Sequence, residues 1–236
     1  MLQYCPLKYK YRYLLRLPTK THHSLSFGQT MHQVLHDFHF NEQRGYIMTL
    51  PELIDLYSKS FIELGYDNPT HKHQRFEAGK LALANYYSSY PHVFGKPLLL
   101  EQSFSMNLDG VKLVGKIDRI DEMSDGKVEL IDYKTGEAKK RDQKAVDKDD
   151  QLTLYALAAK NVLNLSVDSL SLYYLEGEPN KLTTTREESA LIQAKSKLID
   201  QIHQIQNSDF PAKPDPVKCG FCEYLSLCPF ATKKSI

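Results

Sequence analysis

The sequence predicts a mixed α/β fold, and two observations carry this prediction. The first is a series of apolar, strand-like runs separated by turn signals: 98–106, Asp109-Gly110, 111–121, Ser124-Asp125-Gly126 and 128–133. This pattern is typical of antiparallel hairpins. The second is a helical segment that begins near residue 147 and leads to a further strand at 170–175. Because strand–helix–strand connectivity follows the hairpins, we expect a mixed sheet flanked by helices.

Helical patterns precede and follow these strands. Residues 3–16 carry apolar positions at helical spacing, which predicts an amphipathic helix that buries Tyr4, Leu7, Tyr11, Leu14 and Leu15. Its basic residues, interleaved with tyrosines, fit either phosphate contacts or a solvated helix face. We expect further helices at 26–40, 49–64, 74–90 and 185–206. A capping box of Thr49 and Glu52 begins the second of these, and the third is expected to end before Pro91.

The composition is that of an ordinary soluble globular protein. The 236 residues include 42% hydrophobic and 25% charged residues, enough for one sizeable domain. A net charge of +1 gives no global attraction to nucleic acid, so any such binding has to use local patches. There is no apolar run of about eighteen residues, no signal-peptide core and no P-loop motif. We therefore expect a cytoplasmic protein without a membrane partner or a motor of its own.

A short stretch around the third strand carries the clearest chemistry. The period of two in a strand places Asp132 and Lys134 on one face, and strand pairing brings Asp118 close to Asp132. Two carboxylates beside a lysine form a divalent-metal site with a cation placed to orient water. A solvated strand edge is the alternative interpretation. Glu101 fits either a third carboxylate of this site or an exposed strand residue.

Three further residues are candidates for the same site. His32 lies beside the apolar stripe of the 26–40 helix, where a histidine is either a satisfied core residue or a ligand. Gln151 and Tyr155 stand four residues apart and share one face of the helix that begins near residue 147. The polar segment 137–150 is expected to form a mobile loop that gates the site or contacts substrate.

The cysteines indicate a second metal-binding region. Cys219, Cys222 and Cys228 have the spacing C-x2-C-x5-C, and Cys5 is the remaining cysteine of the chain. In an intracellular protein such a pair indicates metal or redox chemistry more than a disulfide. Thiolates suit zinc or an iron–sulfur cluster, and buried unreactive cysteines are the third possibility. Use of all four would tie the two ends of the chain together.

Taken together, these motifs resemble those of the PD-(D/E)XK nucleases of the RecB-like type that carry an iron–sulfur cluster. That group includes the AddB nuclease domain, CRISPR adaptation nucleases and nuclease modules of some UvrD-like helicases. The similarity covers almost the whole chain and rests on six motifs in family order: Cys5-Pro6, Gly28-x-x-x-His32, Gly115-Lys-Ile-Asp118-Arg-Ile-Asp121, Ile131-Asp132-Tyr-Lys134-Thr-Gly136, Gln151-x-x-x-Tyr155 and the cysteine tail. Each motif alone is weak, whereas six in order are strong.

The resemblance implies roles for individual residues. His32, Asp118, Asp132 and the backbone carbonyl of Tyr133 would bind Mg²⁺ or Mn²⁺. Lys134 would position the attacking water, and Gln151 and Tyr155 would hold the substrate strand or orient the site. A [4Fe-4S] cluster would be held by Cys5, Cys219, Cys222 and Cys228, with zinc as the alternative occupant.

The resemblance also implies a domain plan and a function. It implies one nuclease domain over 1–236, with a helical annex at 41–96, a catalytic core at 97–206, and an iron–sulfur staple formed by 207–236 with Cys5. The implied activity is metal-dependent hydrolysis of DNA single strands or ends, as an exonuclease or single-strand nuclease in repair, recombination or DNA processing. The enzyme would be free-standing or work with a helicase. The alternatives are a catalytically silent DNA-binding module and a redox sensor.

Overall fold

The computed structural model describes residues 2–136, 143–177 and 180–232. Two compact units form within it: residues 22–197, which we call the sheet unit, and residues 1–21 with 198–236, which we call the terminal unit. No helix in the described part of the chain is long and apolar enough to cross a membrane.

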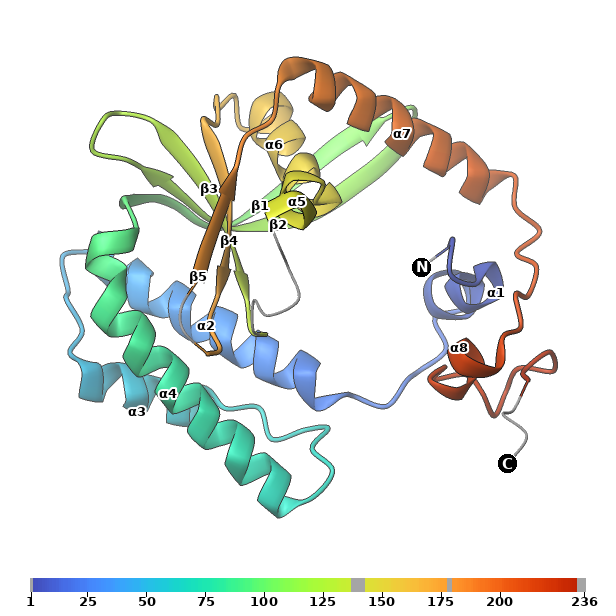
Figure 1. Ribbon diagram of the computed structural model, residues 1–236, viewed down its shortest axis with the longest axis horizontal. Helices are drawn as coiled ribbons and strands as arrows, with labels where there is room; N and C mark the ends of the chain where they lie inside the picture. Colours follow the sequence, from blue (N-terminus) through green and yellow to red (C-terminus); the bar gives the residue numbers. More distant parts are fainter. Residues whose placement is uncertain (1, 137–142, 178–179, 233–236) are drawn as a thin grey trace. The chain divides into compact units, whose positions relative to one another are not determined.

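The described residues of the sheet unit form a five-stranded mixed sheet in the order β1-β2-β3-β4-β5 (Figure 1). The strands are β1 (Lys96–Leu108), β2 (Val111–Glu122), β3 (Val128–Lys134), β4 (Ser169–Tyr174) and β5 (Asn180–Thr184). All neighbours are antiparallel except β3 and β4, which are parallel. The mixed α/β prediction is therefore confirmed. The short strand β5 was not predicted.

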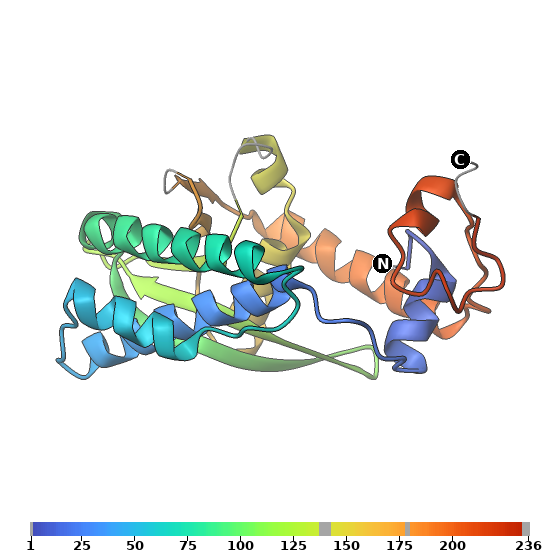
Figure 2. The same cartoon turned by 90° about the horizontal axis from the view of Figure 1, so that it is seen from below.

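Helices cover both faces of this sheet. On one face lie α2 (His23–Gln43), α3 (Leu50–Ser60) and α4 (Pro69–Val93), which run side by side in Figure 2 and pack with Tyr133 and Tyr173 in one apolar core. On the other face, α6 (Asp150–Val162) contacts β1, β3 and β4. Asp149 caps α6 by accepting hydrogen bonds from two backbone amides of its first turn.

In the sheet unit, the predicted ends of two helices and one predicted loop are wrong in detail. The capping box of Thr49 and Glu52 forms as predicted, but α3 ends at Ser60. Helix α4 continues through Pro91 to Val93, because a proline in the last turn removes only one hydrogen bond of the helix. Part of the predicted loop 137–150 is a helix, α5 (Gln143–Asp147). Residues 137–142 of that loop lie outside the described residues.

The terminal unit contains little regular structure. It holds α1 (Pro6–Tyr9), a π-helical turn (Lys10–Leu14), α8 (Pro216–Gly220) and the end of α7 (Glu188–Gln206). The predicted 3–16 helix is therefore shorter than expected, and Tyr4, Leu14 and Leu15 are exposed instead of buried. The two ends of the chain meet here. The Tyr4 hydroxyl donates to the Lys218 carbonyl at 3.3 Å, and Lys8 pairs with Glu223.

Candidate active site

Three side chains from three elements of the sheet unit converge on one point. His32 Nδ1 on α2 lies 3.3 Å from Asp118 Oδ1 on β2 and 4.0 Å from Glu101 Oε1 on β1. Within the described ranges, this is the only group of three His, Cys, Asp or Glu residues whose ligand atoms all lie within 4.8 Å of one another. One imidazole and two carboxylates form a donor set that fits a hard divalent cation such as Mg²⁺ or Mn²⁺.

The sheet places Asp118 where two strands begin to separate. The pairing of β2 with β3 ends at the pair Arg119↔Ile131. Asp118 and Asp132, the next residue on each strand, lie just beyond this last pair. Asp118 Oδ2 accepts a hydrogen bond from the Tyr133 amide at 2.9 Å. Because this bond fixes one carboxylate oxygen toward β3, the other oxygen is held beside His32.

Glu101 belongs to this cluster, and its interpretation as an exposed strand residue is wrong. Its side chain is only 17% exposed and forms an ion pair with Lys116. The backbone of Glu101 has φ +47°, in the left-handed region that costs energy for a residue other than glycine. Such strain is often retained at functional sites. Counting back from the Asp109-Gly110 turn places Glu101 opposite Asp118, a signal that was available in the sequence.

Asp132 and Lys134 lie beside this cluster and are tied to α6. Lys134 Nζ is 2.6 Å from Asp132 Oδ2 and donates to Gln151 Oε1 at 2.7 Å. The Gln151 amide nitrogen in turn donates to Asp132 Oδ1 and to the Tyr155 hydroxyl, at 2.9 and 2.7 Å. One glutamine therefore fixes the lysine, the carboxylate and the tyrosine relative to one another. Gln151 and Tyr155 therefore lie directly beside the Asp132–Lys134 pair.

The pKa values around the site reflect a concentration of negative charge. Burial and the charge of Asp118 raise the pKa of Asp132 to about 6, against the opposing effects of Lys134 and His32. For His32, burial lowers the pKa, but the hydrogen bond and charge of Asp118 outweigh it and leave the pKa raised. Burial also raises the pKa of the Tyr155 hydroxyl. Carboxylates that repel one another when ionised favour a bound cation.

A cavity of about 580 Å³, lined by both polar and apolar groups, opens onto the cluster, and we call it the polar cavity because most of its lining residues are polar. It is bordered by α2, by the end of α3 and by the β1–β2 hairpin, through Ser24, Gly28, Gln29, His32, Gln33, Ser60, Glu101, Lys116 and Asp118 among others. The three clustered side chains therefore line this cavity.

A buried network supports the two site strands from the opposite side of the sheet. The Arg119 guanidinium, 1% exposed, donates to Asp121 at 2.5 Å and to the Tyr133 hydroxyl at 3.3 Å. It also contacts His39 Nε2 at 2.7 Å and the Tyr86 hydroxyl at 3.3 Å. Because Arg119 follows Asp118 and Tyr133 follows Asp132, this network joins the backbones that carry both carboxylates.

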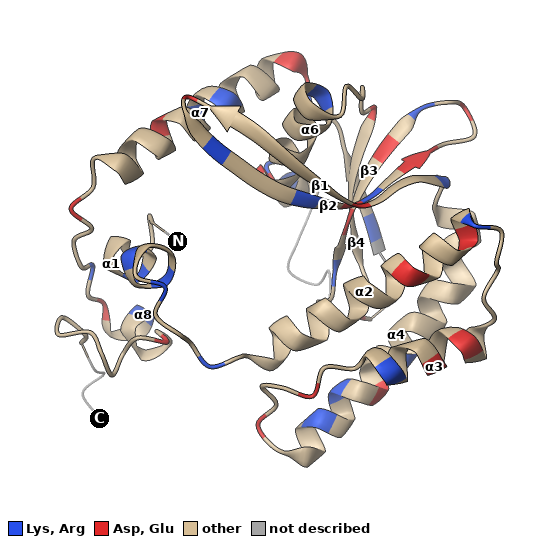
Figure 3. Ribbon diagram, turned by 180° about the vertical axis from the view of Figure 1, so that it is seen from behind, with Lys and Arg blue, Asp and Glu red and all other residues tan. Residues whose placement is uncertain are grey.

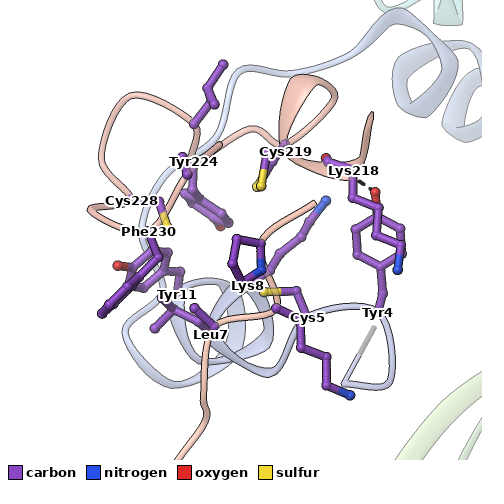
Figure 4. Close-up of a pocket in the computed structure, with 16 residues that line it drawn as sticks. Tyr4, Cys5, Leu7, Lys8, Tyr11, Lys218, Cys219, Tyr224, Cys228 and Phe230 are labelled. Carbon is purple, nitrogen blue, oxygen red and sulfur yellow. Dashed lines mark hydrogen bonds between the residues drawn. The ribbon is translucent and has the colours of Figure 1, made fainter. Parts of the chain in front are cut away.

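The four cysteines line a single pocket of the terminal unit. Figure 4 shows Cys5, Cys219 and Cys228 around this pocket, and Cys222 also lines it. Its surface is almost wholly apolar, with Tyr4, Leu7 and Tyr11 on the N-terminal side. All four are free thiols, half-buried. Four thiols around one apolar pocket form a donor set that fits zinc or an iron–sulfur cluster.

A five-stranded mixed sheet flanked by helices on both faces is consistent with the fold of PD-(D/E)XK nucleases. The chain belongs to the PD-(D/E)XK nuclease superfamily, whose family model matches residues 1–229. Members of this superfamily generally use Mg²⁺ or Mn²⁺. The predicted superfamily is therefore confirmed.

Individual relatives extend this picture. The chain is 29% identical to the Gene 69 protein of Mycobacterium phage L5 over 135 residues, which are 55% of this chain and 44% of that protein. It is 27% identical to the Gene 69 protein of Mycobacterium phage D29 over 135 residues, 55% and 47% of the two chains. The chain thus spans about half the length of these curated relatives. A crystal structure from Eubacterium rectale, provisionally described as an exonuclease, has the same fold at TM-score 0.52 and 12% identity, covering 98% of this chain and 84% of that one.

Proposed function

We propose that this protein is a metal-dependent deoxyribonuclease that cuts single strands or strand ends, as an exonuclease or single-strand nuclease. The observation that carries the proposal is the cluster of His32, Glu101 and Asp118 beside the Asp132–Lys134 pair, at the mouth of a polar cavity. Carboxylates that border a cavity and face a lysine are suited to hydrolysis of a phosphodiester.

The metal would be held by His32, Asp118, Asp132 and the backbone carbonyl of Tyr133, with Glu101 as a further ligand. When bound, Mg²⁺ or Mn²⁺ supplies Lewis-acid stabilisation of charge on the phosphate and lowers the pKa of bound water. Lys134 orients the attacking water and offsets the charge that develops on the scissile phosphate. Gln151 holds the Lys134 ammonium through its 2.7 Å hydrogen bond. The attack is therefore prepared by positioning, without a covalent intermediate.

The terminal unit would hold a [4Fe-4S] cluster through Cys5, Cys219, Cys222 and Cys228. The cluster has a structural role in this proposal, because it binds both ends of the chain in a unit with few buried apolar residues. Zinc on the same thiolates would have the same mechanical effect. Chemical analysis for iron, sulfide and zinc in protein purified without oxygen distinguishes the two.

A cellular role in DNA metabolism is part of the same proposal. A nuclease of this superfamily without a P-loop in its own sequence fits DNA repair, recombination or DNA processing, either alone or beside a helicase subunit or domain. The protein would work in the cytoplasm. The phage relatives are about twice as long as the part that matches this chain, which is compatible with a further domain beside the nuclease part in those proteins.

Cleavage of end-labelled single- and double-stranded DNA with Mg²⁺ or Mn²⁺ tests the nuclease proposal. We expect Lys134→Ala to reduce cleavage by about 10²- to 10⁴-fold, the usual contribution of one positioned catalytic group. Lys127→Ala is the matched control, since Lys127 lies in the exposed turn before β3 and pairs only with Asp125 among the ion pairs found.

The outcomes separate the candidate functions. Metal-dependent products that disappear in Lys134→Ala and persist in Lys127→Ala support the proposed site. DNA binding by the wild type without cleavage in either metal would favour a catalytically silent binding module instead. Equal cleavage by Lys134→Ala and the wild type would reject the assignment of the catalytic lysine.

A further inference from the structure

The β1–β2 hairpin extends beyond the site and presents an exposed face that is polar except for Val114. Alternate residues on the two strands are exposed, and three cross-strand pairs bring them together: Ser103↔Lys116, Ser105↔Val114 and Asn107↔Lys112. We call these six residues the arm face. Figure 3 shows basic positions along this hairpin. Between Glu101 at the site and Asp109 at the tip, the arm face carries two lysines and no acidic residue.

The other side of the hairpin is packed and therefore fixes the direction of the arm face. Phe104, Met106 and Leu108 are buried, and the rings of Phe104 and Tyr155 lie 6.1 Å apart. Gly115 makes this packing possible, because a Cβ there would lie 2.4 Å from the Phe104 ring. Since α6 carries both Tyr155 and Gln151, one helix positions the active site and the hairpin together.

Lys116 joins the arm face to the candidate site. Its ammonium pairs with Glu101, and Lys116 lines the same polar cavity as His32 and Asp118. Lys112 is four residues further along the strand. At about 3.3 Å per residue, Lys112 lies about 20 Å along the strand from Asp118. A stacked nucleic-acid strand covers this distance with about six nucleotides at 3.4 Å each.

We propose that the arm face binds the phosphate backbone of the substrate strand on one side of the scissile bond. This inference rests on the proposed nuclease function and adds a substrate-binding surface to it. Lysines supply the charge complementarity to phosphate, and serine and asparagine side chains donate hydrogen bonds to phosphate and sugar oxygens. None of these groups discriminates between bases, so the arm face binds without regard to sequence.

The test compares Lys112→Gln with Lys96→Gln. Lys96 is an exposed lysine of β1 at the end of the β1–β2 hairpin opposite to Lys112, which makes it a matched control. Binding of a labelled single-stranded 15-mer is measured with Ca²⁺ in place of Mg²⁺ at several salt concentrations. Loss of one phosphate contact reduces the magnitude of the slope of log K against log salt concentration by about 0.7, where K is the association constant. We therefore expect Lys112→Gln to bind about eightfold more weakly at 50 mM salt and about threefold more weakly at 200 mM.

Substrate length provides a second test of the same surface. With its bases stacked, a tetranucleotide spans about 14 Å and does not cover the roughly 20 Å from the site to Lys112. Its binding and cleavage are therefore expected to be equal, within twofold, in Lys112→Gln and in the wild type. Melting temperatures measured alongside identify any loss of folding.

The outcomes distinguish the inference from the function on which it rests. An unchanged salt slope in Lys112→Gln, with normal cleavage by the wild type, overturns the arm face and leaves the nuclease proposal intact. An equal defect in Lys96→Gln also overturns it, because the effect would then follow net charge. A wild type that neither binds nor cleaves either oligonucleotide overturns both proposals.

Discussion

The two candidate metal-binding regions are held in place by different means. In the sheet unit, the site residues stand on a five-stranded sheet with helices on both faces and a large apolar core. In the terminal unit, only Pro6 and Tyr224 are buried among the described residues. The sheet unit therefore has the buried area to fold without a metal, whereas the terminal unit does not. Where apolar burial is scarce, bound metal or clusters commonly supply the stability.

The strongest test of this contrast is loss of one thiol. We expect Cys222→Ser to unfold the terminal unit, because structural metal binding on thiolates is worth about 10–16 kcal/mol in small domains. Limited proteolysis with mass spectrometry should then show cuts within 1–21 and 198–236 and a protected sheet unit. Iron and sulfide content should fall in parallel.

Ser226→Ala is the control for this experiment, since Ser226 is exposed and lies between Cys222 and Cys228. An equally protected terminal unit in Cys222→Ser and Ser226→Ala, with equal metal content, would contradict the idea that the thiols bind a stabilising group.

The converse test removes the buried cation of the sheet unit. Arg119→Met leaves the Asp121 carboxylate, which is fully buried, without its main partner. Breaking a buried ion pair from one side typically costs about 3–5 kcal/mol. We expect a loss of this size in the free energy of unfolding of the sheet unit, measured by urea denaturation.

Lys127→Met provides the scale for this loss. It breaks the ion pair with the exposed Asp125, and solvent screens such surface pairs so strongly that they contribute little to stability. Equal destabilisation by the two substitutions would mean that the Arg119 network does not hold the site strands together.

The smallest expected effect is a pH dependence of the sheet unit alone. Burial and the charge of Arg119 lower the pKa of His39 to about 4, although Glu42 opposes this, and the Tyr86 hydroxyl is its remaining polar neighbour. Because the folded pKa lies below the unfolded value, the unfolded state binds the proton first, and stability falls as pH drops from about 6.5 toward 4. Between pH 7.5 and 5 this amounts to about 2 kcal/mol.

Urea denaturation of the wild type and His39→Gln at both pH values measures the His39 contribution as a difference. His32, whose pKa is raised, contributes with the opposite sign in both proteins and cancels in this comparison. Glu42 has a lowered pKa and adds to the loss only at lower pH. The same pH dependence in both proteins would reject the buried-histidine account.

The same contrast explains which features the sequence predicted. Asp118, Asp132 and Lys134 follow from hairpin register and the period of two, which are local rules. The position of Glu101 opposite Asp118 could be predicted by the same counting from the Asp109-Gly110 turn. The contacts of Arg119 could not be predicted, because its partners come from α2 and α4, and no local pattern brings these helices behind the sheet.

Two of the fold elements that were missed have physical reasons of the same kind. Strand β5 has the polar sequence NKLTT, and its only strand partner in the described sheet is β4, so its structure depends on tertiary pairing. The last turn of α4 contains Pro91, which local rules interpret as a stop. The iron–sulfur cluster, the metal ligands and the helicase connection stay predictions, because they concern ligands and partners.

The assembly of the terminal unit from both ends of the chain determines when it can form. Residues 214 positions apart meet in it, as the contact between Tyr4 and Lys218 shows. At about 5–20 residues per second, the ribosome releases Cys5 about 10–40 s before the other three cysteines. During this interval the sheet unit can fold, while Cys5 is a free thiol open to oxidation. On the proposed assignment, cluster insertion has to wait until Cys219, Cys222 and Cys228 have been synthesised, and the cell's supply of iron and sulfide from that moment governs how much of the terminal unit forms.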